Sequence, residues 1–109
     1  MLRAFATKTT KKFKVQIMYN GQKPDITHDT VTILFKKNAD PNAPTELSVD
    51  ADVTTEGING VASFHISATD NTLEPGIYFY EIWWNLANGT DKYLLTEQNS
   101  KVKILPTIA

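Results

Sequence analysis

The sequence predicts an all-β fold, an antiparallel sandwich of about seven short strands. Three observations support this fold class. Several segments alternate apolar and polar side chains with the period of two that is typical of a half-buried strand. Turn signals rich in Gly, Pro and Asn separate these segments at fairly regular spacing. No long window shows helical periodicity, and the strand-helix alternation of nucleotide-binding α/β folds is absent.

The first two predicted strands flank a loop. Residues 13–19 place an aromatic or β-branched side chain at every second position, and Asn20-Gly21 then ends the strand as a turn dipeptide. Residues 30–36 are rich in β-branched residues and predict the second strand. The intervening residues 22–29 contain Pro24 and are expected to form the loop.

The next two predicted strands are separated by turns of different kinds. Residues 38–45 contain two prolines and predict an exposed connection. Residues 47–54 resume the alternation and predict a third strand with one face in water. The two glycines in residues 56–60 favour a turn, and residues 61–67 predict a fourth strand with His65 pointing outward.

The last three predicted strands begin at a Pro-Gly turn, Pro75-Gly76. This turn leads into the strongest strand signal of the chain, residues 77–84. Asn88-Gly89 is a strong hairpin signal, which makes residues 92–96 the return strand. Residues 101–105 then predict the strand that closes the sheet.

The length and composition indicate one independently folding domain. A chain of 109 residues is near the commonest domain size, and 41% hydrophobic with 21% charged residues is ordinary for a soluble globular protein. We place the domain at residues 11–106, with an N-terminal extension at residues 1–10 and a C-terminal tail at residues 107–109.

The charge and cysteine content exclude several classes of function. Eleven basic and twelve acidic residues leave a net charge of −1, so we expect no binding to nucleic acid or anionic lipid. The lysines near the start of the chain are interpreted as a solvated terminus or strand face; they are Lys8, Lys11, Lys12 and Lys14. Without cysteine, neither disulfides nor thiolate sites can form.

No membrane association and no cleaved signal peptide are expected. The apolar part of residues 1–6 is too short for a signal peptide, and lysines follow where it should continue. No stretch approaches the roughly 20 apolar residues that span a bilayer.

No constellation of catalytic, cofactor-binding or metal-binding residues is found. His28 and His65 are the two histidines, and neither has a second ligand at a familiar spacing. Asp50, Asp52 and Glu56 superficially resemble a calcium loop, but the glycine required at its sixth position is absent. We therefore expect that the protein is not an enzyme and needs no cofactor or metal.

The aromatic strand at residues 77–84 is the most informative feature. Because Tyr78 follows a Pro-Gly turn, it is our candidate for a tyrosine corner, in which the hydroxyl bonds back to the upstream backbone. Its parity assigns Tyr80, Ile82 and Trp84 to the core. The opposite face is then Ile77, Phe79, Glu81 and Trp83, which is largely apolar as well.

A strand that is apolar on both faces must be covered on both faces. One interpretation is that the chain itself covers the outer face, either with a loop or with the N-terminal segment, for example residues 2–5. The second is a protein interface formed by Ile77, Phe79 and Trp83, because aromatic anchors dominate binding energy. The third is a carbohydrate-binding module in which Trp83 or Trp84 stacks on sugar rings.

Three segments resemble the immunoglobulin-like domains of bacteriophage tail and baseplate proteins, such as the N-terminal domain of upper baseplate proteins. They are Phe13-Lys14-Val15, residues 29–33 and residues 75–82. The similarity extends loosely over residues 11–105, and it departs at Glu97-Gln98-Asn99, where a glycine is usual. The resemblance implies an immunoglobulin-like sandwich and a structural or assembly protein of the virion, made in the host cytoplasm. Its expected partners are other virion proteins or copies of itself, as a homo-oligomer.

Overall fold

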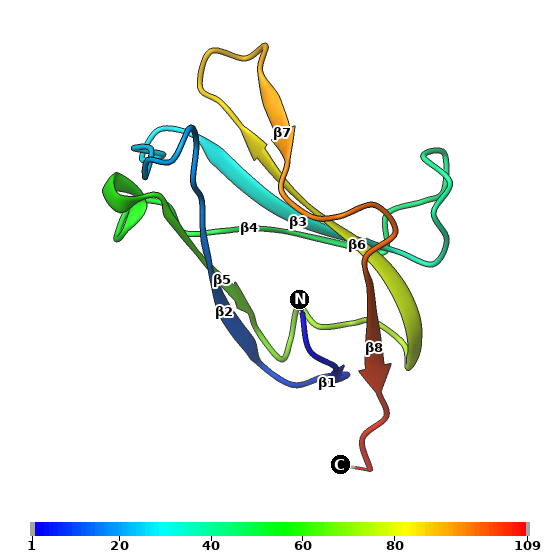
Figure 1. Cartoon of the computed structure of the whole chain (residues 1–109). Helices are drawn as coiled ribbons and strands as arrows, with labels where there is room; N and C mark the ends of the chain where they lie inside the picture. Colours follow the sequence, from blue (N-terminus) through cyan, green and yellow to red (C-terminus); the bar gives the residue numbers. More distant parts are fainter. Residues whose placement is uncertain (1, 109) are drawn as a thin grey trace.

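The computed structural model describes residues 2–108 and consists almost entirely of β-strands (Figure 1). The described chain contains eight strands and one short 3-10 helix. These are β1 (Phe5–Ala6), β2 (Lys11–Gln16), β3 (Thr30–Lys36), β4 (Leu47–Asp50), η1 (Gly57–Asn59), β5 (Val61–Ile66), β6 (Gly76–Asn85), β7 (Lys92–Leu94) and β8 (Lys101–Leu105). The all-β prediction is therefore confirmed.

The strands form two sheets of unequal size. The larger sheet has the order β1-β8-β6-β3-β4, and β7 also pairs with β6. The smaller sheet contains only β2 and β5, which are antiparallel. The sequence analysis predicted antiparallel pairing throughout, and this is wrong at one place, because β1 runs parallel to β8 with Phe5 opposite Ile104. A parallel pair cannot be closed by a hairpin, so it left no local signal in the sequence.

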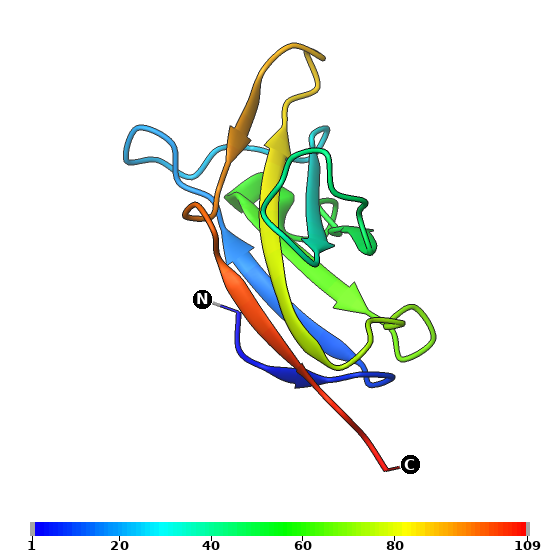
Figure 2. The same ribbon diagram turned by 90° about the vertical axis from the view of Figure 1, so that its right-hand side faces the viewer.

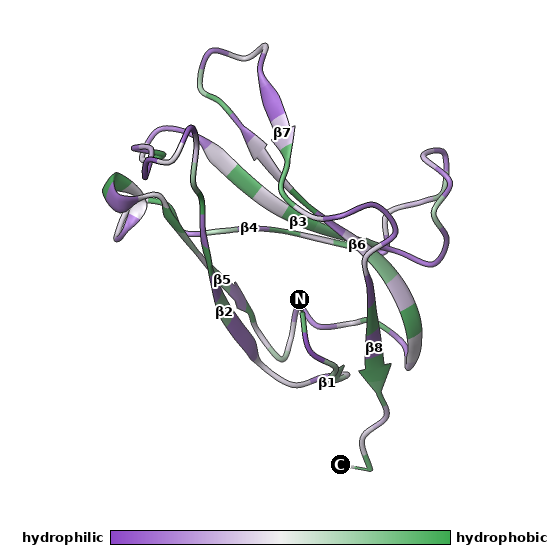
Figure 3. Cartoon of the chain, in the orientation of Figure 1, coloured by the Kyte–Doolittle hydropathy of each residue, from purple (hydrophilic) through white to green (hydrophobic). Residues whose placement is uncertain are grey.

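The core lies between the two sheets and is built from every second residue of the strands. Figure 3 shows the resulting alternation of hydrophobic and paler bands along β3 and β6. Val31, Ile33 and Phe35 of β3 are completely buried, and they face the smaller sheet, whose Phe64 is also buried. These alternations are the period-two patterns that predicted the strands.

The N-terminal segment belongs to the sheet instead of extending from it. The Phe5 side chain is buried, and its ring packs edge-on against that of Phe35. The Asn71 side-chain amide donates hydrogen bonds to the carbonyl oxygens of Ala6 and Thr9, both at 2.9 Å. Residues 2–10 of the predicted extension are thus anchored to the domain. Met1, and Ala109 of the predicted tail, lie outside the described residues.

Three connections meet at one end of the molecule, the upper end in Figure 1. They are the β2–β3 loop, the segment around η1, and the β6–β7 hairpin. Gly60 ends η1 with φ +75°, and a Cβ at this position would lie 2.9 Å from the carbonyl oxygen of Ile17. The backbone conformation and the close approach both require glycine.

Candidate protein-interaction face

The inner face of β6 is part of the core, as its parity predicted. Tyr78, Tyr80 and Trp84 are each less than 5% exposed, and Ile82 is also buried. The Trp84 indole N–H donates a hydrogen bond of 2.8 Å to Oδ2 of Asp29, just before β3. Oδ1 of the same carboxylate accepts the backbone N–H of Ala87 at 2.9 Å. Asp29 therefore ties the β6–β7 hairpin to the start of β3.

Tyr78 makes the hydrogen bond that a tyrosine corner requires. Its hydroxyl donates to the backbone carbonyl oxygen of Glu74 at 2.8 Å, which pins the Pro-Gly turn to the strand that follows it. Burial raises the pKa of the Tyr78 hydroxyl, because the charged phenolate would lose its hydration.

The outer face of β6 carries a partly exposed apolar stripe. Ile77 is 54% exposed, whereas Phe79 and Trp83 are half-buried. On the adjacent strand β3, the half-buried Leu34 stands opposite Glu81 in the pairing register. We call these four apolar residues the outer stripe: Leu34, Ile77, Phe79 and Trp83.

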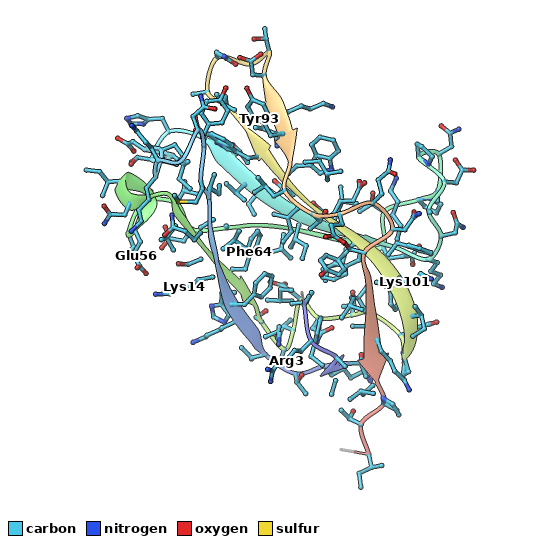
Figure 4. All side chains as sticks on the ribbon, viewed as in Figure 1. Arg3, Lys14, Glu56, Phe64, Tyr93 and Lys101 are labelled. Atoms are coloured by element: carbon cyan, nitrogen blue, oxygen red, sulfur yellow. The ribbon has the colours of Figure 1, made fainter. Side chains whose placement is uncertain are left out.

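Lysine side chains cover part of the outer stripe. The ammonium group of Lys92 lies 5.1 Å from the centre of the Trp83 ring, and that of Lys101 lies 5.3 Å from the centre of the Phe79 ring. Figure 4 shows Lys101 on the larger sheet, far from Lys14 and Phe64 of the smaller one. This arrangement explains how a solvent-facing stripe of aromatic residues is partly shielded from water.

The expectation that residues 2–5 cover the outer face is wrong. The backbone N–H of Leu2 donates to the hydroxyl of Tyr80 at 2.9 Å, and the side chain of Tyr80 points to the core. Phe5 packs against Phe35, also in the core. β1 is the edge strand of the larger sheet beside β8, and the contacts of Leu2 and Phe5 are on the inner side of that sheet.

A loop overhangs the outer stripe and encloses a small hollow. In Figure 2 the β3–β4 connection passes in front of β6, and Lys36 Nζ donates to the Pro41 carbonyl oxygen at 3.0 Å. The hollow has a volume of about 260 Å³. Its lining includes Phe79 and Trp83 together with polar side chains, among them Asp40 and Asn99.

A second aromatic group, which the sequence analysis did not identify, lies at the loop end of the molecule. The rings of Tyr19 and Tyr93 are 5.6 Å apart, and each contacts the ring of Trp84. The hydrogen bond between the two tyrosine side chains raises the pKa of Tyr93, because it stabilises the protonated hydroxyl. Trp84 and Tyr93 face each other on the paired strands β6 and β7, whereas Tyr19 lies in the β2–β3 loop, far away in the sequence. No local pattern indicates that Tyr19 joins the other two rings.

The residues considered as calcium ligands serve as hydrogen-bond and ion-pair partners. Asp50 Oδ1 accepts the hydroxyl of Thr32 at 2.6 Å. Asp52 accepts hydrogen bonds from Thr54 and Thr55. These bonds lower the pKa of Asp52 to about 2, and the bond from the Thr55 hydroxyl has the largest effect. Glu56 forms an ion pair with Lys14.

Metal-ligating side chains do not cluster within residues 2–108. His28 and His65 are both exposed and lie on different parts of the fold, one in the β2–β3 loop and the other on β5. No group of three or more His, Asp or Glu side chains in this range is arranged to hold a metal ion. The same range has no helix with the length and apolar character needed to cross a membrane.

No protein-family model matches this chain, and no curated protein sequence matches it either.

Proposed function

We propose that this protein is an immunoglobulin-like module that acts in the assembly of a bacteriophage particle, by binding another virion protein and not by catalysis. The observation that carries the proposal is the outer stripe, an apolar surface on a strand whose other face already fills the core. Such a surface costs solubility unless a partner covers it.

The arrangement of strands supports the immunoglobulin-like assignment. Central β6 pairs with β3 on one side and with β8 on the other, while β2 and β5 form the facing sheet. In immunoglobulin domains, strands C, F and G similarly face a sheet that contains B and E. The Tyr78 hydrogen bond lies at the start of the strand that corresponds to F, where a tyrosine corner is found.

The charges around the outer stripe indicate the chemistry of the partner. Lys101 and Lys103 of β8 stand opposite Phe79 and Ile77, respectively. On the other side, Lys36 of β3 stands opposite Phe79. An apolar centre with a cationic border is complementary to a surface with an apolar anchor and acidic residues around it. We therefore expect a partner of that kind.

The resemblance of residues 75–82 to phage tail and baseplate domains supports a place in the virion. The resemblance depends on the order of residues along the strand, and it shares Ile77 and Phe79 with the outer stripe. If both arguments hold, the protein is present in purified particles and the outer stripe is required for its incorporation.

The experiment compares two charge substitutions at exposed isoleucines. Ile77→Glu places a carboxylate in the outer stripe, and Ile58→Glu is the matched control, because Ile58 is 67% exposed on η1. Particles assembled with each variant are purified and the protein is quantified by mass spectrometry. We expect the Ile77→Glu protein to be absent from the particles and the Ile58→Glu protein to be incorporated in the normal amount. Absence of the wild-type protein from particles, or equal incorporation of both variants, would overturn the proposal.

A carbohydrate-binding module is the alternative, and the hollow beside Trp83 favours it. A partly exposed indole with Asp40 and Asn99 nearby offers a stacking surface and polar groups for hydroxyls. Trp84 cannot take this role, since it is 4% exposed and its indole N–H is bonded to Asp29. Binding on a glycan array that is lost in Trp83→Ala would establish this alternative in place of the protein partner.

A further inference from the structure

The smaller sheet has a free edge at β2. Within residues 2–108, β2 pairs only with β5, which lies on one side of it (Figure 2). The backbone N–H of Ile17 donates to the Gly60 carbonyl oxygen at 2.8 Å, so odd-numbered residues of this strand point their backbone groups toward β5. The backbone groups of Lys12, Lys14 and Gln16 therefore point away from β5, toward the free edge.

A large open cavity adjoins this edge. It has a volume of about 590 Å³ and lies between β2 and the β7–β8 connection. Half-buried and buried apolar side chains form its walls: Leu2, Phe13, Val15, Tyr80, Ile82 and Leu95. The two sheets therefore leave apolar surface between them uncovered at the position that a further strand beside β2 would occupy.

We propose that the free edge of β2 accepts an extended segment of a partner protein, which adds to the smaller sheet as its third strand. Its backbone would pair with Lys12, Lys14 and Gln16, and every second side chain would enter the cavity. A strand of six residues, the length of β2, spans roughly 20 Å. This site is separate from the outer stripe, which lies on the other face of the larger sheet.

The charges beside the edge indicate an acidic segment. Arg3, Lys11 and Lys14 line the cavity, and the only acidic residue in its lining is Glu97. The exposed side chains of Lys12 and Lys14 lie on the outer face of β2, next to the positions that an added strand would fill. Lys14 already forms an ion pair with Glu56, so Lys12 is the main charge that the added strand would face. Opposite charges on directly facing residues stabilise a strand pair. The segment should thus alternate apolar residues with Asp or Glu.

Two registers of pairing between this edge and a second copy of the chain bring lysines together. Two β2 strands that pair antiparallel about Phe13 place Lys12 opposite Lys14, and pairing about Lys14 places the two Lys14 side chains opposite each other. Like charges in this position destabilise a pair, and edge lysines generally prevent sheets from joining. The same lysines that discourage self-association favour an acidic partner.

The test uses two capped octapeptides, one of alternating valine and glutamate and the other of alternating valine and lysine. Binding is measured by isothermal titration, and amide hydrogen exchange is followed by NMR. We expect the glutamate peptide to bind and to slow exchange at the amides of Lys12, Lys14 and Gln16. The lysine peptide should do neither.

Charge reversal provides the matched control. Lys12→Glu should weaken binding of the glutamate peptide about two- to fivefold, the effect of one cross-strand charge pair. Lys23→Glu, at an exposed lysine in the β2–β3 loop, should leave it unchanged. The proposal would be overturned if the glutamate peptide fails to bind, if both peptides bind equally, or if the peptide slows amide exchange elsewhere than in β2. Ile77→Glu should bind the peptide normally, so this result is independent of the outer stripe.

Discussion

The two faces of β6 both carry large apolar side chains but have different surroundings. On the inner face, Trp84 contacts the rings of Tyr19 and Tyr93, and its indole N–H reaches Asp29 in another segment. On the outer face, Trp83 lies under a lysine, and its indole N–H bonds Glu81 of the same strand at 3.2 Å. The inner tryptophan joins distant parts of the chain, whereas the outer one makes mainly local contacts. The stability of the fold should therefore depend on Trp84, and the binding of a partner should depend on Trp83.

The largest effect is expected from Trp84→Ala. Removing this buried ring leaves a cavity among Tyr19, Tyr93 and the core, and such truncations typically cost about 3 to 5 kcal/mol of unfolding free energy. Trp83→Ala should cost far less, because its ring is partly exposed. Urea denaturation of both variants measures the difference. Equal losses would contradict the assignment of the two faces.

Asp29→Ala should have the next largest effect. The substitution removes the acceptor of the buried Trp84 indole N–H, and an unpaired donor that stays out of water costs about 1 to 3 kcal/mol. The backbone N–H of Ala87 also loses its acceptor, but this residue is exposed and water can replace it. Asp29→Asn is the control, since its amide retains one acceptor oxygen. We expect the midpoint of denaturation to fall in the order wild type, Asn, Ala. A reversed order would show that Asp29 does not hold Trp84.

Tyr78→Phe tests the turn at the start of the inner face. Loss of the hydrogen bond to Glu74 should cost about 1 kcal/mol, the net value of a typical hydrogen bond. Circular dichroism during urea denaturation at pH 7 measures this loss.

The same variant should change the alkaline pH dependence of stability. Because the pKa of Tyr78 is raised in the folded state above the ordinary value of 10.0, the folded protein holds this proton more tightly. The contribution of protonated Tyr78 to the free energy of unfolding is complete below pH 10 and is lost as the pH rises through the pKa of the folded state. The stability of wild type should therefore fall more steeply above pH 10 than that of Tyr78→Phe. Parallel curves would contradict the burial of the hydroxyl.

The smallest effect on stability is expected from Ile77→Ser in the outer stripe. Ile77 is 54% exposed, so its truncation should change the unfolding free energy by no more than about 0.5 kcal/mol. Thermal denaturation measures this change, and a Tm close to that of wild type is expected. A large drop would mean that the outer stripe belongs to the core of the fold.

Local patterns predicted the strands well where the evidence lay within a few residues. The alternation in residues 30–36 and 77–84 identified β3 and β6 and the correct inner face of each. The strand β1 was missed, because two residues give no periodicity and their partner β8 is far along the chain. The role of Asp29 was missed for the same reason, since Trp84 is distant in sequence.

By itself, the sequence determined the all-β class, the position of most strands and the face that each turns to the core. These depend on the period of two and on turn residues, which act over a few positions. Only the tertiary structure decided which strands lie side by side, which groups cover the outer stripe, and that β2 keeps a free edge beside an apolar cavity. Those outcomes depend on contacts between residues far apart in the chain, and one local pattern is compatible with many such pairings.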